Sequence, residues 1–314
     1  MPARLSAYWT DLPAATRGIA LMLFSTVCFA FMHALIRHLS TDLHPFEIAF
    51  FRNAFGLLVL LPWLLHAGLE PWRTRRFPLH ALRSVINICA MLAYFTALSL
   101  TPIAQVTALS FTAPIFSAIL GMLILGEVFR LRRWSAIGIG FLGTLVILRP
   151  GFETIDTGSW LTLLSALLWG FTVITIRVLG RTDSSLTITT YMSLLLALLS
   201  VVPAALVWHT PEGVQWLWLL AIGALGTLGQ IAVAQSLKEA EVGVVMPFDF
   251  CKLIWVAVLG YLLFAEIPGL YVWLGGALIF AASTYIAYRE NQVARAEAAA
   301  EREKAAAARI DGPV

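Results

Sequence analysis

A carboxylate and an ammonium group lie three residues apart within one of the most apolar stretches of this sequence. Asp249 and Lys252 belong to residues 241–266, which read EVGVVMPFDFCKLIWVAVLGYLLFAE. On a helix this spacing places two side chains on neighbouring positions of one face, and Pro247 removes a backbone donor just before them. A charge at membrane depth costs about 2.5–3.5 kcal/mol on insertion scales, so it faces a partner or a water-filled cavity. The stretch therefore predicts a polar site inside an apolar bundle.

Two interpretations of this pair stand side by side. In the first, Asp249 and Lys252 form a buried ion pair that only fixes the helix. In the second, Lys252 attracts a carboxylate of a bound solute, while Asp249 pairs with an ammonium group of the solute or carries a proton. The sequence leaves both interpretations open, and it leaves proton coupling open as well.

Three further polar residues are candidates for the same site. His33 falls in the middle of an apolar segment and titrates near neutral pH, which suits a gating or proton-relay role, although a lone histidine also serves as an interior hydrogen-bonding group. Intramembrane amides mostly join helices through hydrogen bonds. Among them we select Asn87 and Gln230 as the two that face the cavity.

Aromatic residues away from the helix ends supply the apolar part of the predicted site. They would line a pocket for a flat hydrophobic solute, and the alternative is packing against lipid or a neighbouring helix. The residues are Tyr94, Phe111, Trp169, Phe250 and Trp255. Tryptophans and tyrosines nearer the ends of the apolar segments are expected to form interfacial belts.

The composition sets the class of protein. Apolar residues make up 60% of the 314 and charged residues only 12%, whereas soluble domains have about 25% charged residues and 45–50% apolar ones. The three cysteines form no CxxC pair, so neither a disulfide framework nor a metal site is indicated. HExxH, GxSxG and phosphate-loop motifs are missing from the sequence, so we predict no catalytic residues and no cofactor.

The apolar segments predict an all-α integral membrane protein with ten transmembrane helices. A span needs about 20 residues, and most of the 21 lysines and arginines then fall on the side of the N-terminus, so both termini are predicted to be cytoplasmic. The predicted segments are 18–39, 45–67, 79–100, 103–126, 132–149, 157–180, 185–208, 214–236, 242–265 and 268–288. Arg73, Arg75, Arg76 and Arg83 are counted together on the cytoplasmic side, around the start of the third span.

The sequence also repeats itself at a distance of about 140 residues. Residues 31–37 read FMHALIR and residues 171–177 read FTVITIR, while Glu127 matches Glu266 at a distance of 139. Because each copy holds five spans, the second must enter the membrane in the opposite orientation. Inverted repeats around a midplane site are typical of secondary transporters. We expect a cytoplasmic N-terminus over 1–17, two five-helix repeats over 18–149 and 157–288, and a cytoplasmic tail over 289–314.

Two runs give the sequence a family likeness. PIFSAILGMLILGE ends the fourth predicted span and KLIWVAVLGYLLFAEIP ends the ninth. The chain thereby resembles the drug/metabolite transporter superfamily, EamA type, over residues 18–288. The resemblance implies alternating access between two five-helix halves around a central cavity, and bacterial exporters of amino acids, including aromatic ones, are the best match within it.

We therefore expect a secondary transporter in the inner (plasma) membrane that moves a small amphipathic metabolite outward. Nucleosides, purines and S-adenosylmethionine are alternative solutes, and an intramembrane enzyme is the rival from another class. The expected partners are the solute and the bilayer, with no nucleic acid, and the protein is expected to be a monomer or homodimer. Glu127 and Glu266 are expected to accept backbone hydrogen bonds from the adjoining turns, and Arg52 either to reach outward or to meet Glu47.

Overall fold

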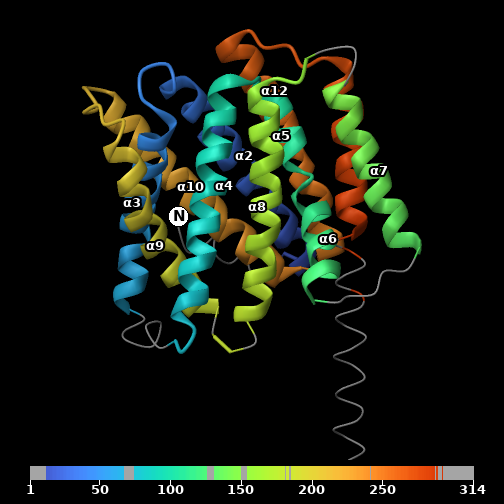
Figure 1. Ribbon diagram of the computed structural model, residues 1–314, viewed down its shortest axis with the longest axis horizontal. Helices are drawn as coiled ribbons and strands as arrows, with labels where there is room; N and C mark the ends of the chain where they lie inside the picture. Colours follow the sequence, from blue (N-terminus) through green and yellow to red (C-terminus); the bar gives the residue numbers. More distant parts are fainter. Residues whose placement is uncertain are drawn as a thin grey trace, which may run out of the picture.

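The protein is a bundle of roughly parallel helices, seen in a computed structural model (Figure 1). The structure describes residues 12–66, 74–125, 131–149, 154–180, 182–183, 185–240, 242–286, 288 and 292. Glu127, most of the predicted tail and most of the predicted N-terminal segment lie outside these residues. The described residues outside the helices form only turns, bends and short connections.

The helix bounds agree closely with the predicted segments. Pro45 begins the second span, Pro102 precedes the fourth, and the Asp156 side chain caps the sixth by accepting a hydrogen bond from the Ser159 amide. Proline in or just before the first helical turn loses no hydrogen bond, because that turn has unpaired amides in any case. The helices are α2 Ala14–Leu39, α3 Pro45–His66, α4 Phe77–Leu100, α5 Ile103–Ser110, α6 Ala113–Leu125, α7 Leu131–Leu148, α8 Thr157–Leu179, α9 Ser185–Ala205, α10 Gln215–Glu239, α11 Val242–Val245, η2 Met246–Phe250, α12 Cys251–Phe264 and the last helix Leu270–Ile286.

These helices make ten membrane-crossing segments, but two of the ten are interrupted. Seven stretches are long and apolar enough to span a membrane, and α7 and the last helix are shorter apolar helices. The fourth span consists of α5 and α6, and the ninth consists of α11, the 3₁₀ turn η2 and α12. The prediction of an all-α protein with ten transmembrane helices is therefore confirmed, and the structure adds a break within two of them.

The contacts between helices follow the inverted repeat. α2 packs on α10 and α12, and its counterpart α8 packs on α4, α5 and α6. Arg17 at the start of α2 forms an ion pair of 2.8 Å with Glu239 at the end of α10. In the mirrored place, Asp156 at the start of α8 accepts a hydrogen bond from Thr101 at the end of α4. The two halves therefore meet across a pseudo-two-fold axis.

Each half contributes equivalent helices to the two flanks of the bundle. α3 lies with its counterpart α9 at one flank, and α7 lies with the last helix at the other (Figure 1). On the second flank, a Cβ atom added to Gly143 would lie 2.7 Å from the Gly275 carbonyl oxygen. The α7 backbone and that of the last helix are thus in direct contact, because neither glycine has a side chain to hold the helices apart.

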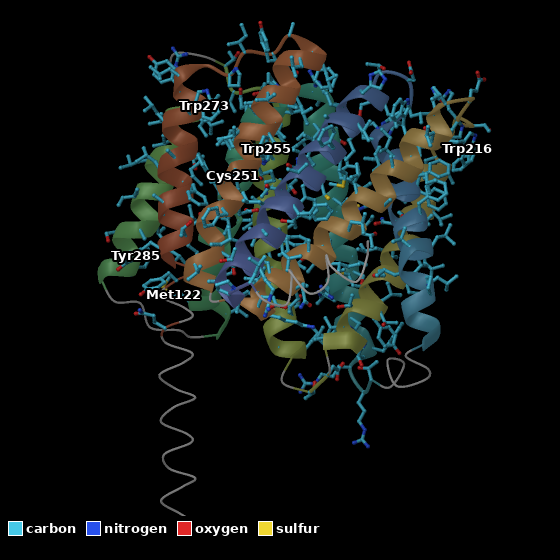
Figure 2. The ribbon with its side chains drawn as sticks, turned by 180° about the vertical axis from the view of Figure 1, so that it is seen from behind. Met122, Trp216, Cys251, Trp255, Trp273 and Tyr285 are labelled. Atoms are coloured by element: carbon cyan, nitrogen blue, oxygen red, sulfur yellow. The ribbon has the colours of Figure 1, made fainter. Side chains whose placement is uncertain are left out.

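Tryptophan and tyrosine side chains mark the two ends of the bundle. Trp216 and Trp273 lie near one end and Tyr285 near the other (Figure 2). Trp134, Trp160, Trp208 and Tyr271 are also exposed close to helix ends. This is the arrangement of an aromatic belt at each membrane interface.

Candidate functional site

The two interrupted helices break at equivalent positions of the repeat. Phe111 and Thr112 separate α5 from α6, and Phe250, 139 residues after Phe111, joins η2 to α12. Pro114 has no amide to offer the Ser110 carbonyl, and Pro247 removes a donor in the ninth span, so neither segment continues as a regular helix. Inverted-repeat transporters place their binding sites at discontinuous helices of this kind.

The two breaks meet in the middle of the bundle. The rings of Phe111 and Phe250 have centroids 5.8 Å apart, and Phe280 of the last helix lies 5.9 Å from the first and 4.6 Å from the second. Residues that are equivalent in two repeats touch each other only close to the symmetry axis. The three phenylalanines therefore mark the junction of the halves, and Phe280 is a member that the sequence did not single out.

Asp249 and Lys252 lie at this junction as a loose ion pair. The Lys252 Nζ atom is 3.6 Å from the Asp249 Oδ2 atom, and the side chains are 14% and 21% exposed. The ammonium group also lies 4.8 Å from the centre of the Phe111 ring, within range of a cation–π interaction. The two charges are close enough to compensate each other, yet both side chains remain partly exposed and so accessible to a charged group of a bound solute.

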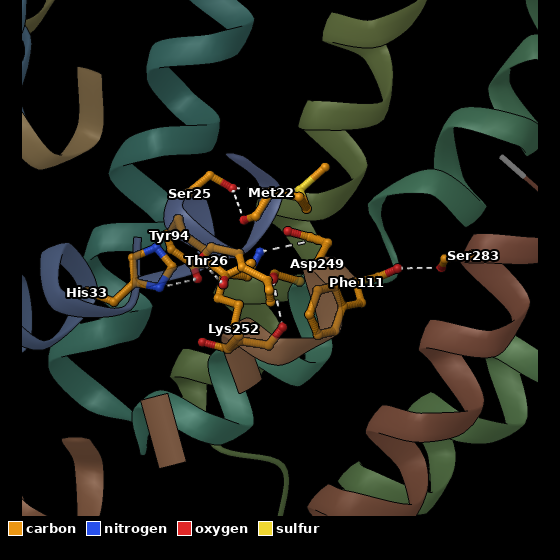
Figure 3. A network of polar contacts seen from close by, with 12 residues as sticks. Met22, Ser25, Thr26, His33, Tyr94, Phe111, Asp249, Lys252 and Ser283 are labelled. Atoms are coloured by element: carbon orange, nitrogen blue, oxygen red, sulfur yellow. Dashed lines mark hydrogen bonds and ion pairs between the residues drawn. The ribbon is translucent and has the colours of Figure 1, made fainter. Parts of the chain in front are cut away.

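His33 and Tyr94 join α2 to α4 beside the pair (Figure 3). The Tyr94 hydroxyl is 3.4 Å from the Nδ1 atom of His33, and the two rings meet edge to face with centroids 5.2 Å apart. His33 is close enough to Lys252, and Tyr94 to Asp249, for electrostatic interaction. Four of the predicted residues, with Phe111 and Phe250, are thus brought into one cluster, which we call the junction site.

Asn87 and Trp169 lie in the bundle but away from the contacts of the junction site. The Asn87 side chain is 3% exposed and forms no hydrogen bond with the described residues. Trp169 is 39% exposed, although it lies between Ser165, which contacts α4, and Gly170, which contacts α6. The cavity-lining roles of Asn87 and Trp169 stay predictions.

Gln230 and Trp255 form no interaction with the junction site among the described contacts, and their cavity-lining roles stay predictions. Trp255 is 40% exposed and shares one face of α12 with the exposed Ile254, Val258 and Leu262, opposite the buried Leu253 and Val256. Gln230 is exposed on α10, one residue after Gly229, which lies against Phe29 of α2.

Hydrogen bonds and an ion pair close the outer end of the bundle. Glu266 pairs with Arg37 of α2 at 3.0 Å, and its other oxygen accepts a hydrogen bond of 3.0 Å from the Ile103 amide. We expected Glu266 to accept from the adjoining turn, and that was wrong, because the free amides nearest to it are those at the start of α5 in the other half. A small cavity lies here, lined by Gln105, Gly260 and Glu266 among others. It is separate from the junction site.

A second outer contact links α8 to the fourth span. Asp156 accepts hydrogen bonds from Thr101, Gln105 and Ser159. Partial burial would raise the pKa of this carboxyl group, but the hydrogen bonds from Ser159 and Thr101 outweigh that effect and hold its pKa below the usual range. Asp156 therefore stays ionised at neutral pH.

The chemistry available at the junction site is binding. One carboxylate, one ammonium group, an imidazole and a phenol are arranged around aromatic rings. Within the described part of the chain, no three His, Cys, Asp or Glu side chains come together as metal ligands do. The site is suited to hold an amphipathic molecule with charges of both signs.

Comparison with known proteins gives a consistent assignment. Residues 16–149 and 156–288 each match the EamA-like transporter family. An S-adenosylmethionine uptake transporter of Rickettsia felis is 28% identical over 88% of the chain and 94% of its own length. A riboflavin transporter of Vibrio cholerae is 31% identical over 90% and 96%. The pseudopaline exporter CntI of Pseudomonas aeruginosa is 27% identical over 84% and 94%.

One solved crystal structure has the same fold. It superimposes with a TM-score of 0.58 over 89% of this chain and 97% of its own, at 18% identity. The named relatives are transporters, so the chain is not an enzyme, and it crosses the inner membrane many times. None of the three relatives is named as an amino acid exporter, so that finer expectation gains no support here.

Proposed function

Since the chain belongs to the EamA-like transporter family, we propose that its solute is a small amphipathic metabolite that joins an amino acid zwitterion to a flat ring. The observation that carries this proposal is the loose Asp249–Lys252 ion pair, whose ammonium group also lies over the Phe111 ring. A zwitterion brings one charge for each member of the pair, and a flat ring finds the aromatic surfaces of Phe111 and Phe250 beside it.

The geometry of the pair supports binding over a purely structural role. Its charged atoms are 3.6 Å apart, whereas those of Arg17–Glu239 and Arg37–Glu266 are 2.8 and 3.0 Å apart. A longer contact is weaker, so a solute that supplies both counter-charges replaces it at a smaller cost. The first half of the repeat has Ser110 and Ala113 at the equivalent positions, so the inverted scaffold does not itself require the charges.

The proposed solute class includes more than one candidate. Aromatic amino acids and S-adenosylmethionine both combine a zwitterion with a planar ring, and the second is named for relatives of this chain. Riboflavin is a second candidate, favoured by the three clustered phenylalanines and by a relative of 31% identity. It has a flat ring system but no zwitterion, so it would use the aromatic surfaces without the charge pair.

Transport would proceed by alternating access. The outer end is closed by Glu266 and Asp156, each of which joins one half to the other. The inner end is joined by Arg17 and Glu239, one from each half. Alternating access would break the outer contacts while the inner ones hold, and then the reverse. The relatives include both uptake and export proteins, and a carrier of this kind runs down whichever gradient it is given.

The experiment is uptake into proteoliposomes that contain the purified protein. The test solutes are labelled L-phenylalanine, S-adenosylmethionine and riboflavin, each with and without an imposed proton gradient. We expect saturable uptake of at least one zwitterionic solute, with empty liposomes as the blank. Uptake of riboflavin alone would favour the second candidate, and uptake of none above the blank would contradict the proposal.

A further inference from the structure

Two arginines lie inside the bundle without a carboxylate partner. Arg83 of α4 is 3% exposed; its Nη1 atom donates a long hydrogen bond of 3.3 Å to the Ile188 carbonyl, and its Nε atom has no partner. Arg52 of α3 donates to the Asn53 side chain at 3.0 Å rather than reaching outward or meeting Glu47. Among the described residues, neither guanidinium group forms an ion pair. Burying an unpaired charge costs several kcal/mol, so the absence of an anion calls for an explanation.

The repeat places these two guanidinium groups in matching surroundings. The Nη2 atom of Arg83 lies 3.2 Å from the sulfur of Met192, and Met192 is the counterpart of Arg52, 140 residues later. Arg83 thus approaches, from α4, the place in the second half that corresponds to the place of Arg52 in the first. On the other side, Arg52 lies against α10, the counterpart of α4, where a Cβ atom added to Gly226 would be 3.2 Å from its Nε atom.

Different residues therefore put the same charge at symmetry-related positions. Arg52 comes seven residues after the outer start of α3, and Arg83 comes six residues after the inner start of α4. At 1.5 Å per residue, each lies about 10 Å from its end of the bundle. If the two charges were only a remnant of the repeat, equivalent residues of the two halves would both be arginine. Arg52 and Arg83 are not equivalent residues, yet they place a positive charge at equivalent positions, which points to a common role.

Each arginine is connected to the junction site through residues of the helices around it. Arg83, Asn87 and Tyr94 follow one another at spacings of four and seven residues and so share one face of α4. Tyr94 contacts His33 at the junction. On the outer side, the same Gly226 position that approaches Arg52 is 2.9 Å from the sulfur of Met32, the neighbour of His33.

We propose that Arg52 and Arg83 are two oxyanion stations, one toward each face of the membrane, at which the carboxylate of the solute binds before it reaches Lys252. The proposal deepens the function proposed above and rests on it. A guanidinium group presents paired N–H donors that match a carboxylate. A buried positive charge on each side also draws an anionic group into the bundle from that side.

The same donors would accept the phosphate of an anionic lipid, and Arg83 is close enough to the inner face for one. The two sources of the anionic group differ in how the effect of an arginine substitution depends on the lipid composition of the membrane. A lipid phosphate would act only in membranes that contain anionic lipid, whereas a solute carboxylate acts in any membrane. The test therefore uses vesicles of phosphatidylcholine alone and vesicles that also contain phosphatidylglycerol.

The first experiment measures KM separately from each face, in proteoliposomes of known orientation, for L-phenylalanine or S-adenosylmethionine, whichever the unaltered protein carries. Arg83→Gln is expected to raise KM from the cytoplasmic face about tenfold, the usual size for loss of one charge-assisted contact, and to leave the outer KM within about twofold. Arg52→Gln is expected to do the reverse. Arg75→Gln, at an exposed arginine near the start of α4, is the matched control and should change neither value.

A second substitution of Arg83 distinguishes a folding defect from the loss of a carboxylate-binding group. A buried unpaired charge costs several kcal/mol, so an apolar side chain of similar size in its place should not destabilise the fold. Arg83→Leu should therefore unfold at the same temperature as the unaltered protein or higher, yet show the same one-sided rise in KM. A lower unfolding temperature with an unchanged KM would assign Arg83 to structure and overturn the proposal.

A binding measurement keeps the stations testable apart from transport. The measurement uses a Lys252→Met background, which removes the carboxylate contact at the junction site. In this background sodium benzoate should raise the unfolding temperature of the detergent-purified protein, benzyl alcohol should not, and the added double variant Arg52→Gln/Arg83→Gln should lose the benzoate effect. Retention of this effect in the double variant, an equal KM change at both faces, or a change seen only with phosphatidylglycerol would each contradict the stations. If the unaltered protein carries no test solute but benzoate binding still depends on the arginines, the proposed function fails and the stations stand.

Discussion

Phe111 and Phe250 occupy equivalent positions of the two halves and face each other with ring centroids 5.8 Å apart. Each ends the first part of an interrupted helix, so the break of one half touches the break of the other. The ammonium group of Lys252 lies 4.8 Å from the Phe111 ring. An aromatic contact on the symmetry axis is thereby combined with a charge pair that only one half supplies.

Removing either ring should weaken solute binding. An aromatic pair contributes about 0.5–1.5 kcal/mol beyond its buried area, so we expect Phe111→Ala and Phe250→Ala each to raise KM by roughly three- to tenfold in proteoliposome uptake. Phe141→Ala, at an exposed phenylalanine of α7, is the control and should leave KM unchanged. Equal effects of all three substitutions would show that the two rings act only through general stability.

Lys252 should matter for solutes that carry a carboxylate. Lys252→Met is expected to raise KM for L-phenylalanine by about tenfold or more, because a charge-assisted contact is lost. Inhibition of uptake by L-phenylalaninamide, which has no carboxylate, should weaken much less. Lys238→Met, at an exposed lysine near the end of α10, is the matched control. If Lys252→Met transports L-phenylalanine normally, Lys252 has only a structural role.

The contacts of Glu266 should control access from outside. Glu266→Gln keeps an acceptor for the Ile103 amide but loses the ion pair with Arg37. We expect a cysteine placed at Gln105, which lines the outer cavity, to react a few times faster with a membrane-impermeant maleimide in this variant. The increase is expected to be modest, because a partly exposed ion pair contributes about 0–1 kcal/mol. An unchanged labelling rate would show that the pair does not hold the outer end closed.

Asp156 should give the protein a pH-dependent share of its stability. Replacing an N-cap residue by alanine costs about 0.5–2 kcal/mol, so Asp156→Ala is expected to lower the unfolding temperature in detergent at pH 7. The folded-state pKa lies below the usual value, so this contribution is complete above about pH 4, the unfolded pKa, and is lost as the pH falls through the folded pKa. The difference between the two proteins should therefore shrink only under acidic conditions. A constant difference down to pH 3 would contradict this assignment.

The sequence was a good guide to the fold, because span length and apolar composition are local properties. The repeat even fixes details: α3 and α9 begin 140 residues apart, at Pro45 and Ser185, and each contains one proline near its end. The ten spans and the inverted arrangement follow from these features and from the placement of basic residues. The division into repeats at 18–149 and 157–288 remains an expectation of the same kind.

The breaks in the fourth and ninth spans were harder to predict. Pro247 and Pro114 are not equivalent in the repeat, yet they interrupt their segments at equivalent places. A proline in an apolar run is also compatible with an ordinary helix start, so Pro114 gave no clear signal. Only the three-dimensional pairing of Phe111 with Phe250 shows that the two breaks belong together.

The orientation of individual side chains was the least predictable part. α10 and α12 are apolar almost all round, so a helical pattern does not separate a lipid-facing side chain from a cavity-facing one. For this reason the exposed face of α12 that carries Trp255 is not assigned to the cavity or to lipid by the sequence pattern. Arg83 was counted with the cytoplasmic residues because it is near the end of a span, whereas its side chain is buried against α9.

The most direct test of the junction site is a structure of the protein with a transported solute bound. We predict that the solute's carboxylate lies within hydrogen-bonding distance, about 3 Å, of the Lys252 Nζ atom, and that its ring lies against Phe111 or Phe250. Asp249 should turn toward the ammonium group of the solute. Solute bound elsewhere, for example in the outer cavity beside Gln105 and Glu266, with the Asp249–Lys252 pair undisturbed, would contradict the account.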